Sequence, residues 1–429
     1  MNALRSTPIR TAEILCVGTE LLLGDIVNTN AAFLSRELAA LGISVYHQTV
    51  VGDHPDRLRA AIDDAFSGNS RPAADLVIMS GGLGPTYDDL TKETVAAYFG
   101  RDMYLDQASL VRIRDYFARR GRPMTKNNEK QAMMPVGAMV LDNDFGTAPA
   151  LAVGDDTHTA ILLPGPPAEL KPIFKEKVVP LLRPYCESVL VSHNVNVMGI
   201  GESAVEEILR DLMIDAQNPT VVPYCSPGEV RIRVTAKADT EDAAEAMCRE
   251  TADEVFRRVG QYVYGMDCDG PEYGIMRHFP HRGLTIGCAE SCTGGMIGQR
   301  LTAIPGSSAV FVGGFMTYTN DAKIRLLGVS PESIAAHTEV SAEIAAEMAE
   351  GARRALGCDV AIATTGYAGP GGGTPENPVG TVYVGVSTVN GTKTARLSYA
   401  QTRSREYIRS AATSEALCMA LRAVLSENE

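Results

Sequence analysis

Hydrophobic positions in the first third of the chain form short apolar runs that alternate with amphipathic segments. The apolar runs at residues 13–18, 43–51 and 76–79 are expected to be buried β-strands. Between them, residues 30–41 and 57–66 repeat apolar side chains with the spacing of a helix. This strand–helix alternation predicts a parallel sheet with helices on both faces. Ligands of such sheets bind beyond the carboxyl ends of the strands.

The pattern changes in the middle of the chain. A strand is expected at residues 188–197, a helix at 201–213 and a pair of strands on either side of residues 226–228. A helix over residues 241–259 and a short strand at 262–265 follow. Strands with two helices on one side predict a small α+β module, and it carries no cluster of residues with the spacing of a catalytic or metal site.

Alternation of apolar runs and helical repeats returns in the last third. Strands are expected at residues 284–289, 311–318, 359–364, 382–388 and 395–399. Helices are expected from about residue 294, over 341–356 and over 406–425. The glycine- and proline-rich loop at 364–381 is expected to form a rigid wall beside the sheet.

The predicted fold class is therefore α/β. Two three-layer α/β domains, over residues 11–170 and 272–427, are joined by a small α+β domain over 171–266. A length of 429 residues is consistent with several domains, each of which buries its own core.

Composition and charge narrow the functional classes. A net charge of −13, from 39 basic and 52 acidic residues, disfavours a general nucleic-acid-binding role. The nine cysteines have no zinc-ligand spacing, and their odd number is typical of reduced thiols in a cytoplasmic protein. The N-terminal segment has no apolar core of a signal peptide, and no apolar run has the length of a membrane span. We expect a cytoplasmic protein with no membrane or nucleic-acid partner.

The polar turn that follows the strand at 284–289 is a candidate anion site. A strand, a glycine-rich turn over residues 290–295 and a helix start leave backbone N–H groups that converge on one point. Ser291 and Thr293 are also good helix N-caps, so part of the pattern would occur without a ligand.

Ser308 and Lys323 are candidates for nucleophilic catalysis. They are separated by one expected strand, and a lysine whose pKa is lowered by burial can activate a serine. His337 stands alone and is a poor third member of a triad. The turn at 292–295 is a candidate source of oxyanion donors. The alternative is that Ser308 caps a turn after Pro305 and that Lys323 is a solvated charge.

Loops after the front strands suggest a phosphate or pterin site with a metal. Gly81, Gly82 and Gly84 allow close approach of the backbone to a ligand, and Asp53 and Asp89 are hard oxygen ligands. The alternative is that both aspartates are helix caps. Aspartate ligands do not discriminate sharply among magnesium, manganese and cobalt.

The front third resembles the molybdopterin-binding domain of the molybdenum-cofactor biosynthesis superfamily, in the form found in CinA (competence/damage-inducible) proteins. The resemblance rests on GTELLLGDIVNTN, VVGDHPDRL, MSGGLGPTYDDLT and ILLPGPPAEL. It implies pterin or metal chemistry at Asp53 and Asp89, or the metal-dependent ADP-ribose pyrophosphatase activity associated with CinA proteins. The middle module is similar in element order to the KH-like domain of CinA proteins. Acidic helices in this module of the present chain favour a spacer over an RNA-binding role.

The last third resembles the CinA C-terminal domain, a nicotinamide mononucleotide deamidase. AESCTGG, PGSS, GGFMTYTNDAK, TTGYAGPGGG and NPVGTVYVG carry the resemblance over about residues 282–425. It implies Ser308 as nucleophile, Lys323 as base, Tyr318 and Thr365 lining the site, and an arginine before the last helix, Arg405 or alternatively Arg403.

The implied reaction is acyl transfer to water without a cofactor. The expected substrate-binding residues of this domain are Glu290, Ser291, Thr293, Gly294, Gly295 and Arg405. Asn377 and Tyr367 depart from the family pattern, which puts substrate affinity in question more than chemistry.

The resemblance also implies small nucleotide substrates and a homodimer. Two alternatives stay open: a pterin-binding or competence-related scaffold without catalysis, and a front domain that processes molybdopterin.

Overall fold

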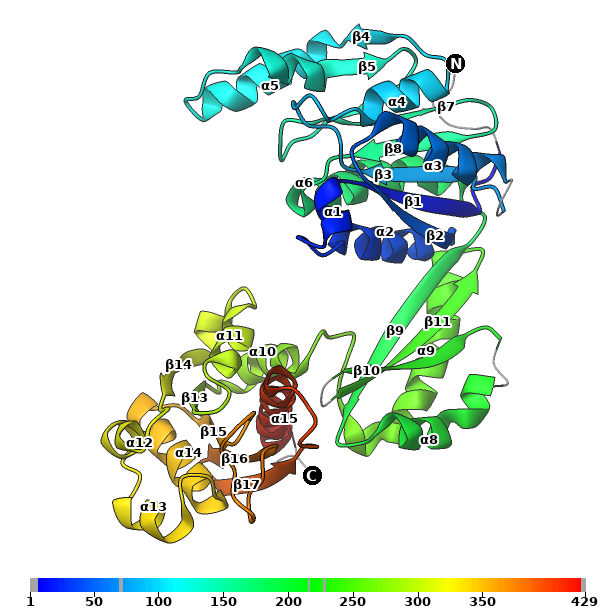
Figure 1. Cartoon of the computed structure of the whole chain (residues 1–429). Helices are drawn as coiled ribbons and strands as arrows, with labels where there is room; N and C mark the ends of the chain where they lie inside the picture. The colour runs from blue at the N-terminus through cyan, green and yellow to red at the C-terminus, as the bar shows by residue number, and fades with distance from the viewer. Residues whose placement is uncertain (1–6, 69–71, 215–216, 227–228, 426–429) are drawn as a thin grey trace. The chain divides into compact units, whose positions relative to one another are not determined.

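The computed structural model describes residues 7–68, 72–214, 217–226 and 229–425 (Figure 1). It separates into two compact units: residues up to 191 together with 237–245, and residues 192–236 together with 246 onward. Each unit is described by itself. Within the described ranges, no helix has both the length and the apolar composition needed to cross a bilayer.

The first unit is built on a six-stranded sheet with the order β2-β1-β3-β8-β7-β6. Its strands are β1 (Thr11–Val17), β2 (Ser44–Val51), β3 (Leu76–Ser80), β6 (Met139–Leu141), β7 (Ala150–Gly154) and β8 (Thr159–Leu163). The first four strands in the sheet order are parallel, as predicted for this domain, whereas β7 and β6 run antiparallel at one edge. Such an edge is common on otherwise parallel sheets.

Helices cover both faces of this sheet because β1 is apolar on both sides. Ile14 and Cys16 pack with α2 and α6 on one face, whereas Leu15 and Val17 pack with α3 and α4 on the other (Figure 1). The helices are α1 (Thr19–Leu23), α2 (Thr29–Ala40), α3 (Pro55–Ser67), α4 (Thr91–Tyr98), α5 (Gln107–Arg119) and α6 (Pro167–Ile173). A two-stranded sheet of β4 (Met103–Leu105) and β5 (Met133–Pro135), with the 3-10 helix η1 (Lys126–Ala132), completes the unit.

The front core extends past the predicted boundary at residue 170. Phe174, Val178 and Leu182 are fully buried in the same apolar cluster as β1 and α2. They lie on the short helices η2 (Phe174–Val178), α7 (Val179–Leu182) and η3 (Arg183–Tyr185). These helices therefore belong to the front domain.

The small module has the predicted α+β composition. Its sheet has the order β10-β11-β9-β12, formed by β9 (Val189–Met198), β10 (Thr220–Ser226), β11 (Glu229–Ala238) and β12 (Val263–Met266). The helices are α8 (Glu202–Ile214), α9 (Glu241–Val259) and the 3-10 turn η4 (Gly260–Tyr262). Met198 and Tyr264 of this module are buried in the core of the C-terminal domain, and most of the module belongs to the same unit.

The C-terminal sheet has the order β14-β13-β15-β16-β17. Its strands are β13 (Ile286–Glu290), β14 (Phe311–Met316), β15 (Val360–Gly366), β16 (Thr381–Thr388) and β17 (Gly391–Ser398). The first three are parallel, and β16 and β17 continue antiparallel.

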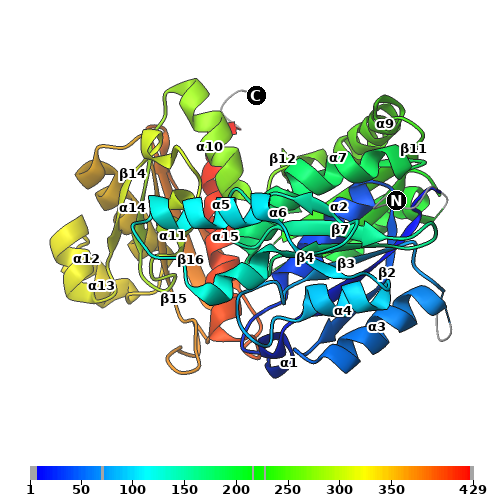
Figure 2. The same ribbon diagram turned by 90° about the horizontal axis from the view of Figure 1, so that it is seen from above.

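Six helices and one 3-10 turn surround this sheet. They are α10 (Pro271–Arg282), α11 (Met296–Thr302), η5 (Ser307–Ala309), α12 (Asn320–Leu327), α13 (Pro331–His337), α14 (Ala342–Leu356) and α15 (Arg405–Leu425). One face packs on α14 and the other on α10 and α15, which lie side by side (Figure 2). Both large domains are thus three-layer α/β structures, which confirms the predicted fold class.

Three helices of this domain were not expected from the sequence. Helix α10 precedes the first expected strand of the domain, and α12 and α13 lie between β14 and the helix expected from residue 341. Helix α12 begins because the Thr319 hydroxyl accepts a hydrogen bond from the Ala322 amide, which caps the helix. This helix carries Lys323.

Candidate active sites

The C-terminal domain has a cavity of about 370 Å³. Ser291 directly follows β13, Tyr318 follows β14, and Thr365 lies at the end of β15; all three line the cavity. The cavity therefore lies at the carboxyl ends of the parallel strands, where α/β sheets bind their ligands.

Lys323 and Ser291 meet inside this cavity. The Lys323 side chain is only 2% exposed, and its Nζ donates a hydrogen bond to Ser291 Oγ at 3.5 Å. Burial lowers the pKa of Lys323 below its ordinary value, and the negative charge of Glu339 partly opposes the shift. A buried lysine with a lowered pKa beside a hydroxyl is the arrangement that activates a serine nucleophile.

Ser308 does not take part in this arrangement, which corrects the sequence-based assignment. It lies on the exposed turn η5, does not line the cavity, and in the described ranges makes no hydrogen bond to Lys323. The reason is topological: Ser308 precedes β14 and Lys323 follows it. A six-residue strand spans roughly 20 Å, so the two residues lie toward opposite ends of the sheet.

The glycine-rich turn after β13 is not an open anion site. Glu290 is 2% exposed, and its carboxylate accepts hydrogen bonds from the amides of Gly295 (2.9 Å), Ile297 (3.2 Å) and Gly298 (3.0 Å). The hydroxyl of Thr293, which is fully buried, also donates to Glu290, at 2.7 Å. The protein's own carboxylate thus occupies the start of α11.

The other residues of this turn have structural roles too. The Gly294 amide donates to the carbonyl of Ser291, so neither it nor the Gly295 amide is open to a substrate. The amides of Cys292 and Thr293 donate to no protein oxygen in the described ranges. Of the five residues predicted here to bind substrate, only Ser291 lines the cavity.

Arg405, Tyr318 and Thr365 lie where the sequence predicted, at the cavity. The Arg405 guanidinium donates to the Tyr318 hydroxyl at 2.9 Å and to the carbonyl of Gly369 at 2.7 Å. The Thr365 hydroxyl donates to the carbonyl of Glu339 at 2.6 Å. Thr365 therefore holds the wall of the cavity.

Two neighbouring arginines, Arg403 before the last helix and Arg409 in its first turns, lie elsewhere. Arg403, the alternative to Arg405, stacks on the Tyr407 ring with its guanidinium 4.5 Å from the centroid and does not line the cavity. Arg409 donates to the carbonyls of Cys292 (3.1 Å) and Thr293 (2.7 Å) and so fixes the turn after β13. Arg409 was not identified from the sequence because its partners are backbone atoms.

Glu339 is a cavity residue that sequence reasoning missed. Its carboxylate accepts a hydrogen bond from the Tyr367 hydroxyl at 3.2 Å. Asn377 donates to the carbonyl of Val340 at 3.0 Å. Tyr367 and Asn377, the two departures from the family pattern, thus both hold the segment that carries Glu339. No motif in the sequence marks this segment as part of the site.

A second cavity, of about 430 Å³, lies in the front domain. It brings together the five residues predicted from the front loops, namely Asp53, Gly81, Gly82, Gly84 and Asp89. A Cβ atom at Gly81 would lie 2.2 Å from the carbonyl oxygen of Val17, and φ at Gly81 is +104°. Glycine is required there by the close packing of this loop on β1.

Asp53 and Asp89 are each held by a threonine. Asp53 Oδ2 accepts from the amide and hydroxyl of Thr19, at 2.8 and 2.9 Å, and Asp89 Oδ2 accepts from the amide of Thr86 at 2.8 Å and from its hydroxyl. Neither aspartate is a helix N-cap, because His54 and Leu90 hold those positions. No group of three or more His, Cys, Asp or Glu side chains in the described ranges is placed to hold a metal.

Lys92 on α4 is a buried lysine that the sequence did not single out. It is 2% exposed, and its Nζ donates to the carbonyls of Lys130 (3.0 Å) and Gln131 (2.8 Å). Burial lowers the pKa of Lys92 to about 8. Gln131 lines the front cavity, so Lys92 fixes one of its walls.

Three family models match successive parts of the chain: "Probable molybdopterin binding domain" over residues 13–184, "Damage-inducible protein CinA KH domain" over 192–265, and "CinA C-terminal domain" over 272–424.

Two curated relatives and one solved structure show the same likeness. A "Putative competence-damage inducible protein" of Moorella thermoacetica is 48% identical over 377 residues, covering 87% of this chain and 90% of its own. A "CinA-like protein" of Kosmotoga olearia is 45% identical over 414 residues, covering 96% and 99%. The crystal structure of competence/damage inducible protein CihA from Agrobacterium tumefaciens is 41% identical and covers 37% of this chain and 94% of its own, with a TM-score of 0.34. This chain belongs to the CinA family.

Proposed function

We propose that the C-terminal cavity hydrolyses the carboxamide of nicotinamide mononucleotide to give nicotinic acid mononucleotide and ammonia, with Ser291 as the nucleophile. The observation that carries the proposal is the buried Lys323 amine within hydrogen-bond distance of Ser291 Oγ at the carboxyl end of β13. The sequence-based mechanism is kept, and the nucleophile moves from Ser308 to Ser291.

The reaction runs through an acyl-enzyme. Neutral Lys323 takes the hydroxyl proton as Ser291 Oγ attacks the carboxamide carbon. The amides of Cys292 and Thr293, which donate to no protein oxygen in the described ranges but lie against the Cys292 sulfur, are the candidate oxyanion donors of this turn. Protonated Lys323 returns the proton to the leaving nitrogen, and ammonia departs. Lys323 then accepts a proton from water as the water attacks the ester, which frees Ser291 and releases the acid.

The substrate phosphate is assigned to Arg405. Arginine has five N–H donors. Arg405 uses one nitrogen for Gly369 and another for Tyr318, so further N–H groups remain for an anion. Lys323 is the other cation of the cavity lining, and it is committed to Ser291.

Two serine variants test the assignment by ammonia release from nicotinamide mononucleotide. Ser291→Ala should lower kcat at least a thousandfold, because the covalent step is lost. Ser308→Ala, the matched control on the exposed turn, should stay within about twofold of the parent protein. The opposite ranking of the two variants would refute Ser291 as nucleophile, and no ammonia release by the parent protein would refute the activity.

For the front domain we propose metal-dependent hydrolysis of ADP-ribose to AMP and ribose 5-phosphate. Asp53 and Asp89 each use Oδ2 for a threonine, and in the described ranges Oδ1 of each accepts no hydrogen bond. A divalent cation bound there would neutralise charge on a diphosphate. The two carboxylates alone give fewer oxygen ligands than such a cation takes, so the diphosphate and water would supply the others.

The competing reading of this domain is pterin binding, which its match to a probable molybdopterin binding domain favours. AMP release from ADP-ribose with Mg²⁺, Mn²⁺ or Co²⁺, and its loss in Asp53→Asn and Asp89→Asn, would support the pyrophosphatase. Binding of molybdopterin without hydrolysis of ADP-ribose would support the alternative.

A further inference from the structure

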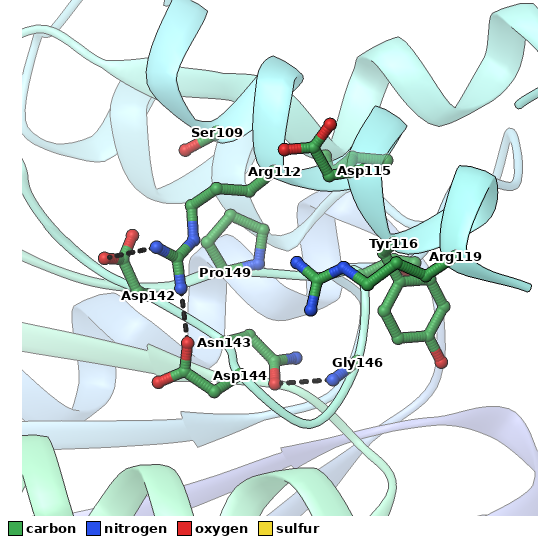
Figure 3. Close-up of a pocket in the computed structure, with 12 residues that line it drawn as sticks. Ser109, Arg112, Asp115, Tyr116, Arg119, Asp142, Asn143, Asp144, Gly146 and Pro149 are labelled. Atoms are coloured by element: carbon green, nitrogen blue, oxygen red, sulfur yellow. Dashed lines mark hydrogen bonds and ion pairs between the residues drawn. The ribbon is translucent and has the colours of Figure 1, made fainter.

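A third cavity, of about 340 Å³, lies in the front domain between α5 and the segment of residues 142–149 (Figure 3). We refer to it as the α5 cavity. No motif in the sequence indicated this cavity, and none of the residues assigned above to catalysis or substrate binding lines it. Its side chains are those of a polar binding site, with two arginines, a tyrosine and three aspartates.

Of the two arginines of the α5 cavity, one is paired with carboxylates and the other is not. Arg112 is neutralised by Asp142, at 3.2 Å, and by Asp144. Arg119, about two helical turns later on α5, makes no ion pair or hydrogen bond in the described ranges. Figure 3 shows its guanidinium beside that of Arg112 and next to the Tyr116 ring. Arg119 therefore has donors and a planar face to offer a ligand.

Ser109 gives an independent indication of a ligand. It lines the same cavity and is 2% exposed, and its hydroxyl is buried without a hydrogen-bond partner. A buried hydroxyl without a partner is costly and requires an explanation. The oxygen is covered by protein atoms, so a ligand in this cavity would supply the missing hydrogen bond once the side chains around Ser109 move aside.

The α5 cavity adjoins the cavity of the glycine loop. Thr147 lines both cavities and accepts a hydrogen bond from Gln131 at 3.0 Å. Asn143, of the α5 cavity, donates to Glu169, of the glycine-loop cavity, at 2.5 Å. The two cavities therefore meet at Thr147, so a ligand that extends beyond one of them lies next to the other.

The charges of the lining indicate which part of such a ligand belongs here. With three aspartates against two arginines, the α5 cavity carries no net positive charge to attract a phosphate. Tyr116, held by the Arg120 guanidinium 3.6 Å from its ring centroid, offers an aromatic surface, and aspartates accept hydrogen bonds from ribose hydroxyls. A neutral nucleoside fits this chemistry.

We propose that the α5 cavity binds the nucleoside end of a nucleoside diphosphate compound whose diphosphate lies against the glycine loop. The inference rests on the front-domain function proposed above and specifies the substrate class. Arg119 and Ser109 bind the base, and the glycine-loop cavity takes the diphosphate.

The test separates nucleoside binding from diphosphate binding in the full-length protein. Isothermal titration with Mg²⁺ uses two non-hydrolysable probes: α,β-methylene ADP-ribose, and methylenediphosphonate, which lacks a nucleoside. Arg119→Ala should raise the Kd of the first probe about tenfold, and Ser109→Ala about threefold. Neither variant should change the Kd of methylenediphosphonate. Arg114→Ala is the matched control, because Arg114 is an exposed arginine of α5 outside the cavity.

The outcomes distinguish this inference from the proposed activity. Equal Kd values of the nucleoside probe for the parent protein, Arg119→Ala and Arg114→Ala would overturn the inference, even if ADP-ribose is hydrolysed. Failure of the parent protein to bind the nucleoside probe would also overturn it. Binding that depends on Arg119 and Ser109, without hydrolysis of ADP-ribose, would support the inference and refute the pyrophosphatase.

Discussion

A substitution at Glu290 distinguishes most clearly between a residue that stabilises the fold and a residue that contacts the substrate. The sequence motif predicted a substrate contact, whereas the carboxylate is buried and accepts three backbone amides and the Thr293 hydroxyl. Glu290→Ala would leave three amides at the start of α11 without an acceptor. A carboxylate is also the favoured group at a helix N-terminus.

The magnitude follows from these bonds. Hydrogen bonds to a charged group contribute about 1.5–3 kcal/mol each. At the low end of that range, the loss of three of them destabilises the local fold by about 4.5 kcal/mol. Glu290→Gln keeps one acceptor oxygen but replaces the other with an NH₂ group, which cannot accept from these amides. We expect Glu290→Gln to lose about half as much stability as Glu290→Ala.

Native-state hydrogen exchange over residues 286–302 measures this effect directly. A loss of about 4.5 kcal/mol corresponds to an approximately two-thousandfold drop in protection. Glu406→Ala is the control, because Glu406 is an exposed glutamate in the first turn of α15. Unchanged protection in Glu290→Ala, together with a raised KM for nicotinamide mononucleotide, would show that Glu290 contacts the substrate and would refute the reasoning.

Three further predictions concern buried cations. Because burial lowers the pKa of Lys323, ammonia release should rise with pH to an inflection below 10.5, and Lys323→Arg, which stays charged, should be inactive; an inflection at or above 10.5 in initial-rate profiles would contradict this. Between pH 8 and 10.5 an unfolded chain keeps the Lys92 proton that the folded chain has lost, so α4 should gain stability with rising pH, by at most about 3 kcal/mol in hydrogen exchange; an equal slope in Lys92→Met would disprove the cause. Arg300 pairs with Glu272 at 2.5 Å and Glu229 at 3.5 Å, so Arg300→Met should cost about 3–5 kcal/mol in hydrogen exchange of α10; a loss below about 1 kcal/mol would count against a buried network.

The fold was largely predictable because its strands are continuous apolar runs. β1, β3 and β13 are buried on both faces, and such strands stand out from their polar loops. Three helices of the C-terminal domain, α10, α12 and α13, were not predicted, and two of them have local features that explain this. Helix α10 contains Gly274 and Pro280, which usually indicate the end of a helix. Helix α12 is only eight residues long and begins on polar residues. Both are stabilised by packing and capping that the spacing of apolar residues does not show.

The sequence predicted a serine and a lysine at this site, but it paired the lysine with the wrong serine. Lys323 was identified as the base, and the structure gives it the expected burial and a lowered pKa. Ser308 was paired with it because only fifteen positions separate them, whereas Ser291 is thirty-two positions away. Proximity in sequence is a poor guide here, because a strand that lies between two residues carries them to opposite ends of a sheet.

The carboxyl ends of the parallel strands predict the members of a site better than proximity in sequence does. The same rule locates the candidate sites of both large domains. In the front domain, Asp53 and the glycine loop directly follow β2 and β3, and they line one cavity. In the C-terminal domain, Ser291 follows β13, and α12 brings Lys323 back from the end of β14. Parallel strands place these positions on one edge whatever their separation in sequence, so a serine before a strand is a weaker candidate than a serine after one. The topology therefore favours the serine of the turn after β13 over the serine before β14 as the candidate nucleophile.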